Sequence, residues 1–124
     1  MSRAALAFLA LALFAAPAAA QTDAGQSEGR WGAIAYGGPN RATGSAVDFY
    51  SADDARQAAL ADCGGRCPRT LVFLRACAAV AQSPGGGLGS ESNRWKGRSI
   101  ARAMAECAKS GPGCSIVVWA CTTH

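Results

Sequence analysis

The six cysteines of this chain constrain its fold more than any other feature, because they fall into two triplets with the same surroundings: Cys63, Cys67, Cys77, then Cys107, Cys114, Cys121. In each triplet an alanine-rich stretch ends in the first cysteine, and a short glycine-containing loop leads to the second. An apolar run then closes on Ala-Cys. The first cysteines of the two triplets are 44 residues apart, and so are the third ones. The sequence therefore describes a duplicated module braced by cross-links.

The N-terminal residues have the composition of a secretory signal peptide. Arg3 precedes an apolar stretch over residues 4–16, and the small residues Ala18 and Ala20 suit cleavage after Ala20. The apolar stretch is too short to cross a bilayer comfortably. We expect residues 1–20 to be removed, leaving a secreted or periplasmic protein with no membrane span.

Export to an oxidising compartment and an even number of cysteines favour three disulfides over a zinc site, which is the alternative for clustered cysteines. A chain of this size that is rich in Gly and Ala has little core to bury, so cross-links would help it to fold. Six cysteines allow many pairings, but a structure shared by the two halves narrows the choice. We expect two local bridges and one between the halves: Cys63 with Cys67, Cys107 with Cys114, and Cys77 with Cys121.

Local patterns predict the elements of the first half. Residues 31–36 and 45–50 have strand character and are separated by Gly-Pro-Asn turn residues. Ser51 followed by acids at Asp53 and Asp54 predicts a helix that runs to about Cys63. Residues after the Cys67 loop, TLVFLRAC, form an apolar run of strand type.

The second half repeats this order. Residues 99–109 predict a helix and residues 114–121 the matching strand, whereas residues 78–82 have weaker strand character. The segment over residues 83–93 is glycine-rich and polar and need not be regular. We expect an α+β fold with two β-β-α-β repeats, at about residues 31–77 and 78–124, after a flexible lead-in over residues 21–30. One mixed or antiparallel sheet with both helices on one face is the most economical arrangement.

Several of these segments resemble the DUF4189 family of small exported bacterial domains. They are the opening WGAIAYG, then ARQAALADC with TLVFLRAC, and finally ARAMAEC with CSIVVWAC. The resemblance covers residues 31–121 and implies export and a fold rather than an activity, because the family is named for an unknown function. The second repeat of the family usually carries a Gly-Trp-rich strand, whereas this chain has GGGLGSESNRW there.

No residues are arranged as a known catalytic chemistry requires. The single histidine is the last residue, His124, and helix capping explains Asp53 and Asp54. The spacing of the other acids, Asp48, Asp62, Glu91 and Glu106, demands no shared site, so a catalytic carboxylate pair would form only if the fold brought two acids together. The glycine-rich segment lacks the Lys-Ser/Thr ending of a phosphate-binding loop. We therefore expect no catalytic residue, cofactor or bound metal.

A basic cluster precedes and opens the second predicted helix: Arg94, Trp95, Lys96, Arg98, Arg102. Cations at a helix N-terminus oppose the helix dipole, so they do not serve helix stability. They indicate an anionic partner, although an ordinary solvated basic face is the alternative. The chain has too few aromatic residues to predict nucleic-acid binding.

These patterns favour an exported, non-enzymatic domain that binds another protein or an anionic envelope or host component. One alternative is a small secreted hydrolase or cell-wall-active enzyme. Another is a secreted effector or inhibitor that acts on another cell. Trp95 beside the basic residues is the aromatic candidate for the binding surface, whereas Trp31 and Trp119 have core or sheet-face patterns.

Overall fold

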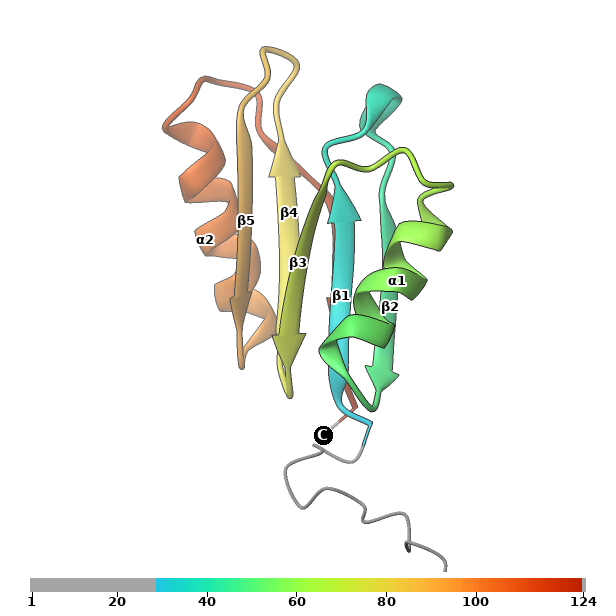
Figure 1. The fold of residues 1–124 in the computed structure, drawn as a ribbon. Helices are drawn as coiled ribbons and strands as arrows, with labels where there is room; N and C mark the ends of the chain where they lie inside the picture. The colour runs from blue at the N-terminus through green and yellow to red at the C-terminus, as the bar shows by residue number, and fades with distance from the viewer. Residues whose placement is uncertain (1–28, 124) are drawn as a thin grey trace, which may run out of the picture.

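Each half of the chain forms a three-stranded antiparallel sheet with one helix (Figure 1). The computed structural model describes residues 29–123, so the predicted signal peptide, nearly all of the predicted lead-in and His124 lie outside the described residues. The first half contains β1 (Trp31–Tyr36), the short 3-10 helix η1 (Pro39–Arg41), β2 (Gly44–Phe49), α1 (Ala52–Asp62) and β3 (Arg69–Leu74). The second contains β4 (Cys77–Gln82), β5 (Leu88–Asn93), α2 (Lys96–Ala108) and β6 (Ser115–Cys121). The α+β class and the repeated β-β-α-β order are confirmed.

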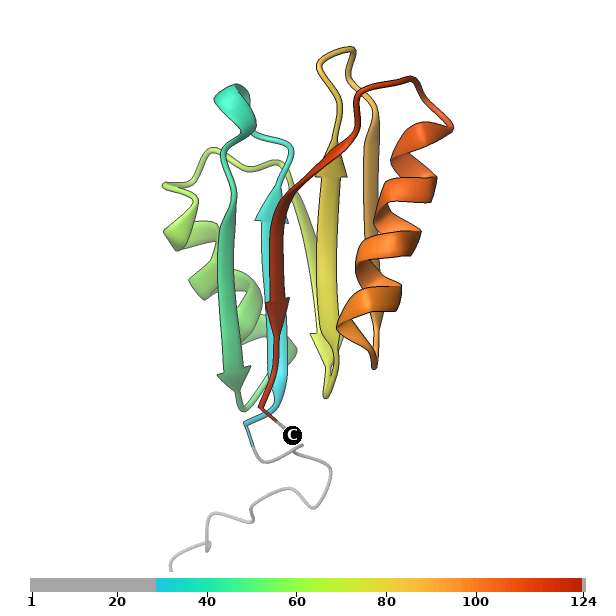
Figure 2. The same cartoon turned by 180° about the vertical axis from the view of Figure 1, so that it is seen from behind.

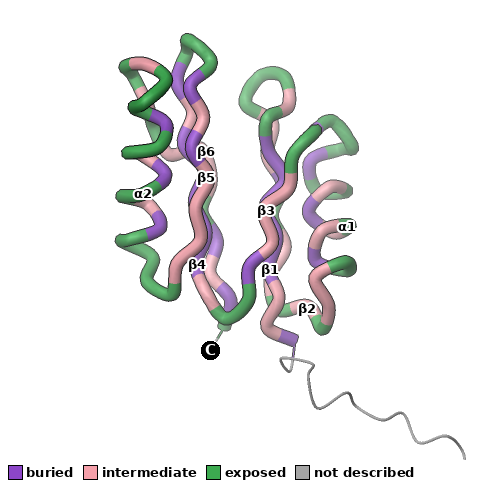
Figure 3. The backbone as a smooth tube through the Cα atoms, turned by 60° about the vertical axis from the view of Figure 1, so that its left-hand side comes forward, coloured by how far each residue is buried: buried purple, intermediate pink, exposed green. Residues whose placement is uncertain are grey.

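The strands are ordered β2-β1-β3 in one sheet and β5-β4-β6 in the other. The two sheets pack face to face, and one helix covers the outer side of each, which gives four layers (Figure 3). On β1, Ala33 and Ala35 pack with α1, whereas Ile34 and Tyr36 pack between the sheets. β4 alternates in the same way. Ala79 and Ala81 pack against α2, whereas Ala78 and Val80 pack against the first sheet.

Two sheets therefore replace the single sheet that was expected, and the helices lie on opposite outer faces. The physical reason is that β1 and β4 are apolar at nearly every position. In a single sheet with both helices on one face, Ile34, Phe73 and Val80 would face solvent. Stacking the sheets buries all three of them.

Each helix backbone lies close to the second strand of its repeat. A Cβ atom at Gly44 in β2 would overlap the carbonyl oxygen of Ala59 in α1. A Cβ atom at Gly89 in β5 would overlap the carbonyl oxygen of Ala103 in α2. Both alanines are fully buried. The same helix–strand contact thus occurs in both repeats. It requires glycine because there is no room for a Cβ atom, and not because the backbone is left-handed.

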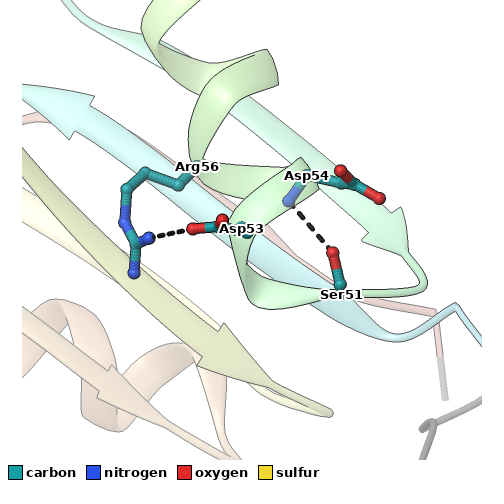
Figure 4. Close-up of polar contacts among 4 residues, drawn as sticks. All are labelled: Ser51, Asp53, Asp54 and Arg56. Carbon is teal, nitrogen blue, oxygen red and sulfur yellow. Dashed lines mark hydrogen bonds and ion pairs between the residues drawn. The ribbon is translucent and has the colours of Figure 1, made fainter.

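The two helices begin differently. The Ser51 hydroxyl accepts a hydrogen bond from the backbone N–H of Asp54 at 3.1 Å, and Asp53 pairs with Arg56 in the first turn (Figure 4). The predicted cap of α1 is therefore confirmed. α2 starts at Lys96, earlier than expected, and has neither a side-chain cap nor an acid in its first turn.

The glycine-rich segment contains a regular strand, β5, although its composition did not require one. β5 pairs with β4 along its whole length. Ser90 forms a hydrogen bond with Tyr36 across the sheets, with 3.0 Å between the two hydroxyl oxygens. Tertiary contacts, rather than strand propensity, account for this element.

The six cysteines form three disulfides, Cys63–Cys67, Cys77–Cys121 and Cys107–Cys114, which are the pairs expected. The two local bridges join the end of a helix to the loop that follows it. The third joins directly paired residues of β4 and β6. No helix within residues 29–123 is long and apolar enough to cross a membrane.

Gly89→Ala should destabilise the protein by about 1–3 kcal/mol, because the new methyl group forces α2 away from β5. Urea unfolding with the disulfides intact measures this loss. Gly97→Ala is the matched control, because Gly97 lies in α2 and no atom lies within 4 Å of the position that its Cβ atom would take. The control should keep or raise stability, by up to about 1 kcal/mol. Equal stability of the two variants would contradict the close contact.

Replacing Cys77 and Cys121 together by alanine should cost about 4 kcal/mol of unfolding free energy in the chain-entropy model. Replacing Cys63 and Cys67 should cost about 2 kcal/mol, because the loop that they close is much shorter. The sequence separations are 44 and 4 residues, respectively. Urea unfolding of both double variants tests this order, and a larger loss for the local bridge would refute it.

Candidate functional site

α2 covers two of the three strands of its sheet. The helix lies mainly over β4 and β5, with Ser99, Ala103 and Cys107 buried against them. Figure 2 shows β6 with no helix across it. Trp119 lies opposite Ala79 on the outer face of β6 and is 48% exposed. The outer face of β6 is therefore open.

An apolar groove lies between α2 and β6. Its volume is about 590 Å³, and its lining consists of one helix residue and four consecutive strand residues: Ile100, Ile116, Val117, Val118, Trp119. No charged side chain contributes to this lining. The lining side chains are all apolar, and polar atoms of the same residues are also accessible in the groove, so it suits a chain segment more than a small polar substrate.

A buried serine fixes the position of α2 beside this groove. The hydroxyl of Ser99 is fully buried and donates a hydrogen bond to the carbonyl oxygen of Cys77 at 3.0 Å. Cys77 is in turn bonded to Cys121 at the end of β6. The start of α2 and the end of β6 are thus held by one hydrogen bond and one disulfide, so the groove is built on a rigid frame.

Two basic side chains lie over aromatic rings at the start of α2. The Lys96 ammonium is 3.3 Å from the centroid of the Trp119 ring, and the guanidinium carbon of Arg94 is 5.4 Å from that of Trp95. Trp95 is 56% exposed. The ion pairs found within residues 29–123 include neither Lys96 nor Arg94. These cations are therefore available to an external anion.

The structure divides the predicted basic cluster. Lys96 and Ile100 are one helical turn apart and both lie toward β6, next to Trp119. Arg98 and Arg102 are exposed and also one turn apart. At about 100° per residue, they lie roughly 200–240° around the helix from Lys96. Arg98 and Arg102 therefore face away from the groove.

Trp119 and Ile116 belong to the groove, whereas the sequence indicated only a core or sheet-face position for Trp119. No local pattern in the sequence predicts that α2 leaves this strand uncovered. The absence of any charge in SIVVWAC was the available signal, because an edge strand normally carries one.

A second, polar hollow of about 410 Å³ lies between the β1–β2 and β4–β5 loops. Arg41 and Arg69 line it together with Gln82, Ser83 and loop glycines. No acid contributes to its lining.

Two of the acids considered for catalysis, Asp48 and Glu106, lie apart. The Asp48 carboxylate accepts hydrogen bonds from the backbone N–H of Thr123 at 2.8 Å and from its hydroxyl at 2.5 Å. Glu106 pairs with Lys109 at 3.0 Å. β2 ends where the C-terminus lies, and α2 ends at the opposite end of the molecule (Figure 1). Asp48 and Glu106 therefore do not form the close carboxylate pair of a glycosidase.

Within the described part of the chain, no group of three or more His, Cys, Asp or Glu side chains could hold a metal ion. All six cysteines are in disulfides, so none is a free thiol.

These features define a duplicated, disulfide-braced α+β domain with an open apolar groove. A family model described as "Domain of unknown function (DUF4189)" matches residues 31–121. The chain belongs to the DUF4189 family, as its motifs had suggested.

The fold has a counterpart among solved structures. The NMR structure of Rv1813c from Mycobacterium tuberculosis matches with a TM-score of 0.60 and 31% sequence identity, over 75% of each chain. A search of curated proteins found no match.

The Lys96–Trp119 contact should stabilise the α2–β6 arrangement by about 0.5–1 kcal/mol, as exposed cation–π pairs do. A double-mutant cycle with Lys96→Ala and Trp119→Ala measures this coupling in urea unfolding. If the double variant loses as much unfolding free energy as the two single variants together, the pair contributes nothing to stability.

Proposed function

We propose that this protein is an exported, non-enzymatic binding domain and that the α2–β6 groove is its binding surface. The observation that carries the proposal is Trp119, a large aromatic side chain that is half exposed on an apolar strand. Exposed aromatic residues beside an apolar hollow are typical of binding hot spots. The Ser99 hydrogen bond and the Cys77–Cys121 disulfide hold the surface rigid, which lowers the entropy cost of binding.

Two features support export. Residues 1–20 have the composition of a signal peptide, and three disulfides are typical of proteins that fold in an oxidising compartment. We infer a secreted or periplasmic location on these grounds.

The partner is another protein or an envelope or host component that presents negative charge. The full sequence carries a net charge of +4, and the chain stays positive without Arg3 of the predicted signal peptide. Lys96 lies at the groove without a carboxylate partner among the described residues. Electrostatic attraction of this kind raises association rates and selects partners by charge. An effector or inhibitor role differs from this proposal only in where the partner resides.

A photo-crosslinking residue with a large aromatic side chain, which keeps the apolar ring of Trp119, should give a covalent adduct with the partner when it is introduced at position 119 in the native host. Position 74 is the matched control, because Leu74 is 43% exposed on an edge strand of the other sheet. Lys96→Glu should weaken the adduct at position 119, because the partner is anionic.

Equal adducts at positions 119 and 74, or none at 119, would contradict the proposed surface. Turnover of a substrate by the purified protein would favour the hydrolase alternative, provided that Asp48→Asn or Glu106→Gln abolished it.

A further inference from the structure

We propose that β6 binds its partner by strand addition: an extended segment of the partner pairs with the free edge of β6 and places apolar side chains in the groove. This inference rests on the proposed function and specifies how the groove is used. Strand addition is a common mode of peptide recognition, in which backbone hydrogen bonds provide affinity and side-chain pockets provide specificity.

The free edge of β6 differs from the other sheet edges in its lack of charge. β2 contains Asp48, β3 contains Arg69 and β5 contains Glu91, whereas β6 has no charged residue. Charged residues on edge strands prevent unwanted pairing with other chains. β6 has a bulge at Val117, where its pairing with β4 shifts register, but it is the one edge strand among residues 29–123 without a charged residue. The lack of charge on β6 indicates an edge that is used.

β6 is available for this pairing. Within residues 29–123 it pairs only with β4, so its other edge has no strand partner there. The strand is seven residues long, which is enough for a ladder of several hydrogen bonds. It is also held in place at its end by Cys121.

The outer face of β6 determines which side chains the added strand should carry. The bulge at Val117 brings Trp119 and Ile116 to the same face of β6, although they are three residues apart. Side chains of the added strand on that face would extend this surface beside Ile100 of α2. These contacts favour apolar residues at every second position. Lys96 lies over Trp119 at one end of this surface and has no carboxylate partner in the described chain. We therefore assign the occupant as an extended, alternating apolar segment with a carboxylate side chain at one end.

The probe is a phage-displayed library of random 12-residue peptides, selected on the intact, oxidised protein. Enriched peptides should combine alternating apolar residues with at least one acid. Trp119→Lys places a charge on the exposed face of β6 and should weaken their binding about tenfold or more, whereas Leu74→Lys should leave it unchanged. Intact mass and thermal unfolding establish that both variants keep their three disulfides and their fold.

N-methylation of the strongest peptide tests strand pairing directly. Methyl groups on alternate backbone nitrogens of one parity block the edge that faces β6, whereas those of the other parity point to solvent. One methylated peptide should lose about tenfold or more in affinity, and the other should bind as the parent does.

Three results overturn strand addition: no enriched peptide, binding that survives Trp119→Lys, or equal binding of the two methylated peptides. If the two methylated peptides bind equally but Trp119→Lys still weakens binding, the groove remains a binding surface and only the proposed backbone pairing is wrong. Crosslinking at position 119 tests the proposed function independently of strand addition.

Discussion

The contact of helix backbone with strand backbone at Gly44 and Gly89 is the constraint on which the other layers depend. Small residues allow each helix to approach its sheet closely, and the alanines at Ala59 and Ala103 complete the contact. Close approach gains dispersion energy but buries little apolar area per residue. The two outer layers are therefore thin, and the larger side chains are concentrated between the sheets, where Ile34, Phe73 and Val80 lie.

The disulfides compensate for these thin layers. Each local bridge joins the end of a helix to the loop beyond it, and so prevents the helix from separating from its sheet at that end. The Cys77–Cys121 bridge acts on β4 and β6, and Ser99 connects the same point to α2. The disulfides that stabilise a small domain with a limited core thus also make the candidate surface rigid.

Much of the fold could be predicted from local signals, because the cap at Ser51 and the repeated helix-cysteine pattern are short-range features. The two-sheet arrangement could have been predicted from β1, since WGAIAY leaves no polar face for solvent. β5 was expected only from the repeated β-β-α-β order, because its own composition is that of a loop. A Gly-Ser pair does occur at both Gly44-Ser45 and Gly89-Ser90. The lack of charge in SIVVWAC indicates an unprotected edge strand, but it does not locate the groove. No local pattern predicts which strand a helix leaves uncovered.

The third disulfide has a consequence for the duplication itself. Each repeat supplies one local pair of cysteines and one that is left over, and the two left over, Cys77 and Cys121, can meet only when both repeats are present. Each repeat likewise has an inner sheet face that only the other repeat covers. A single repeat would carry an odd thiol and an exposed apolar sheet. Two repeats are therefore the minimum for this architecture, because only then is every cysteine paired and each inner sheet face covered.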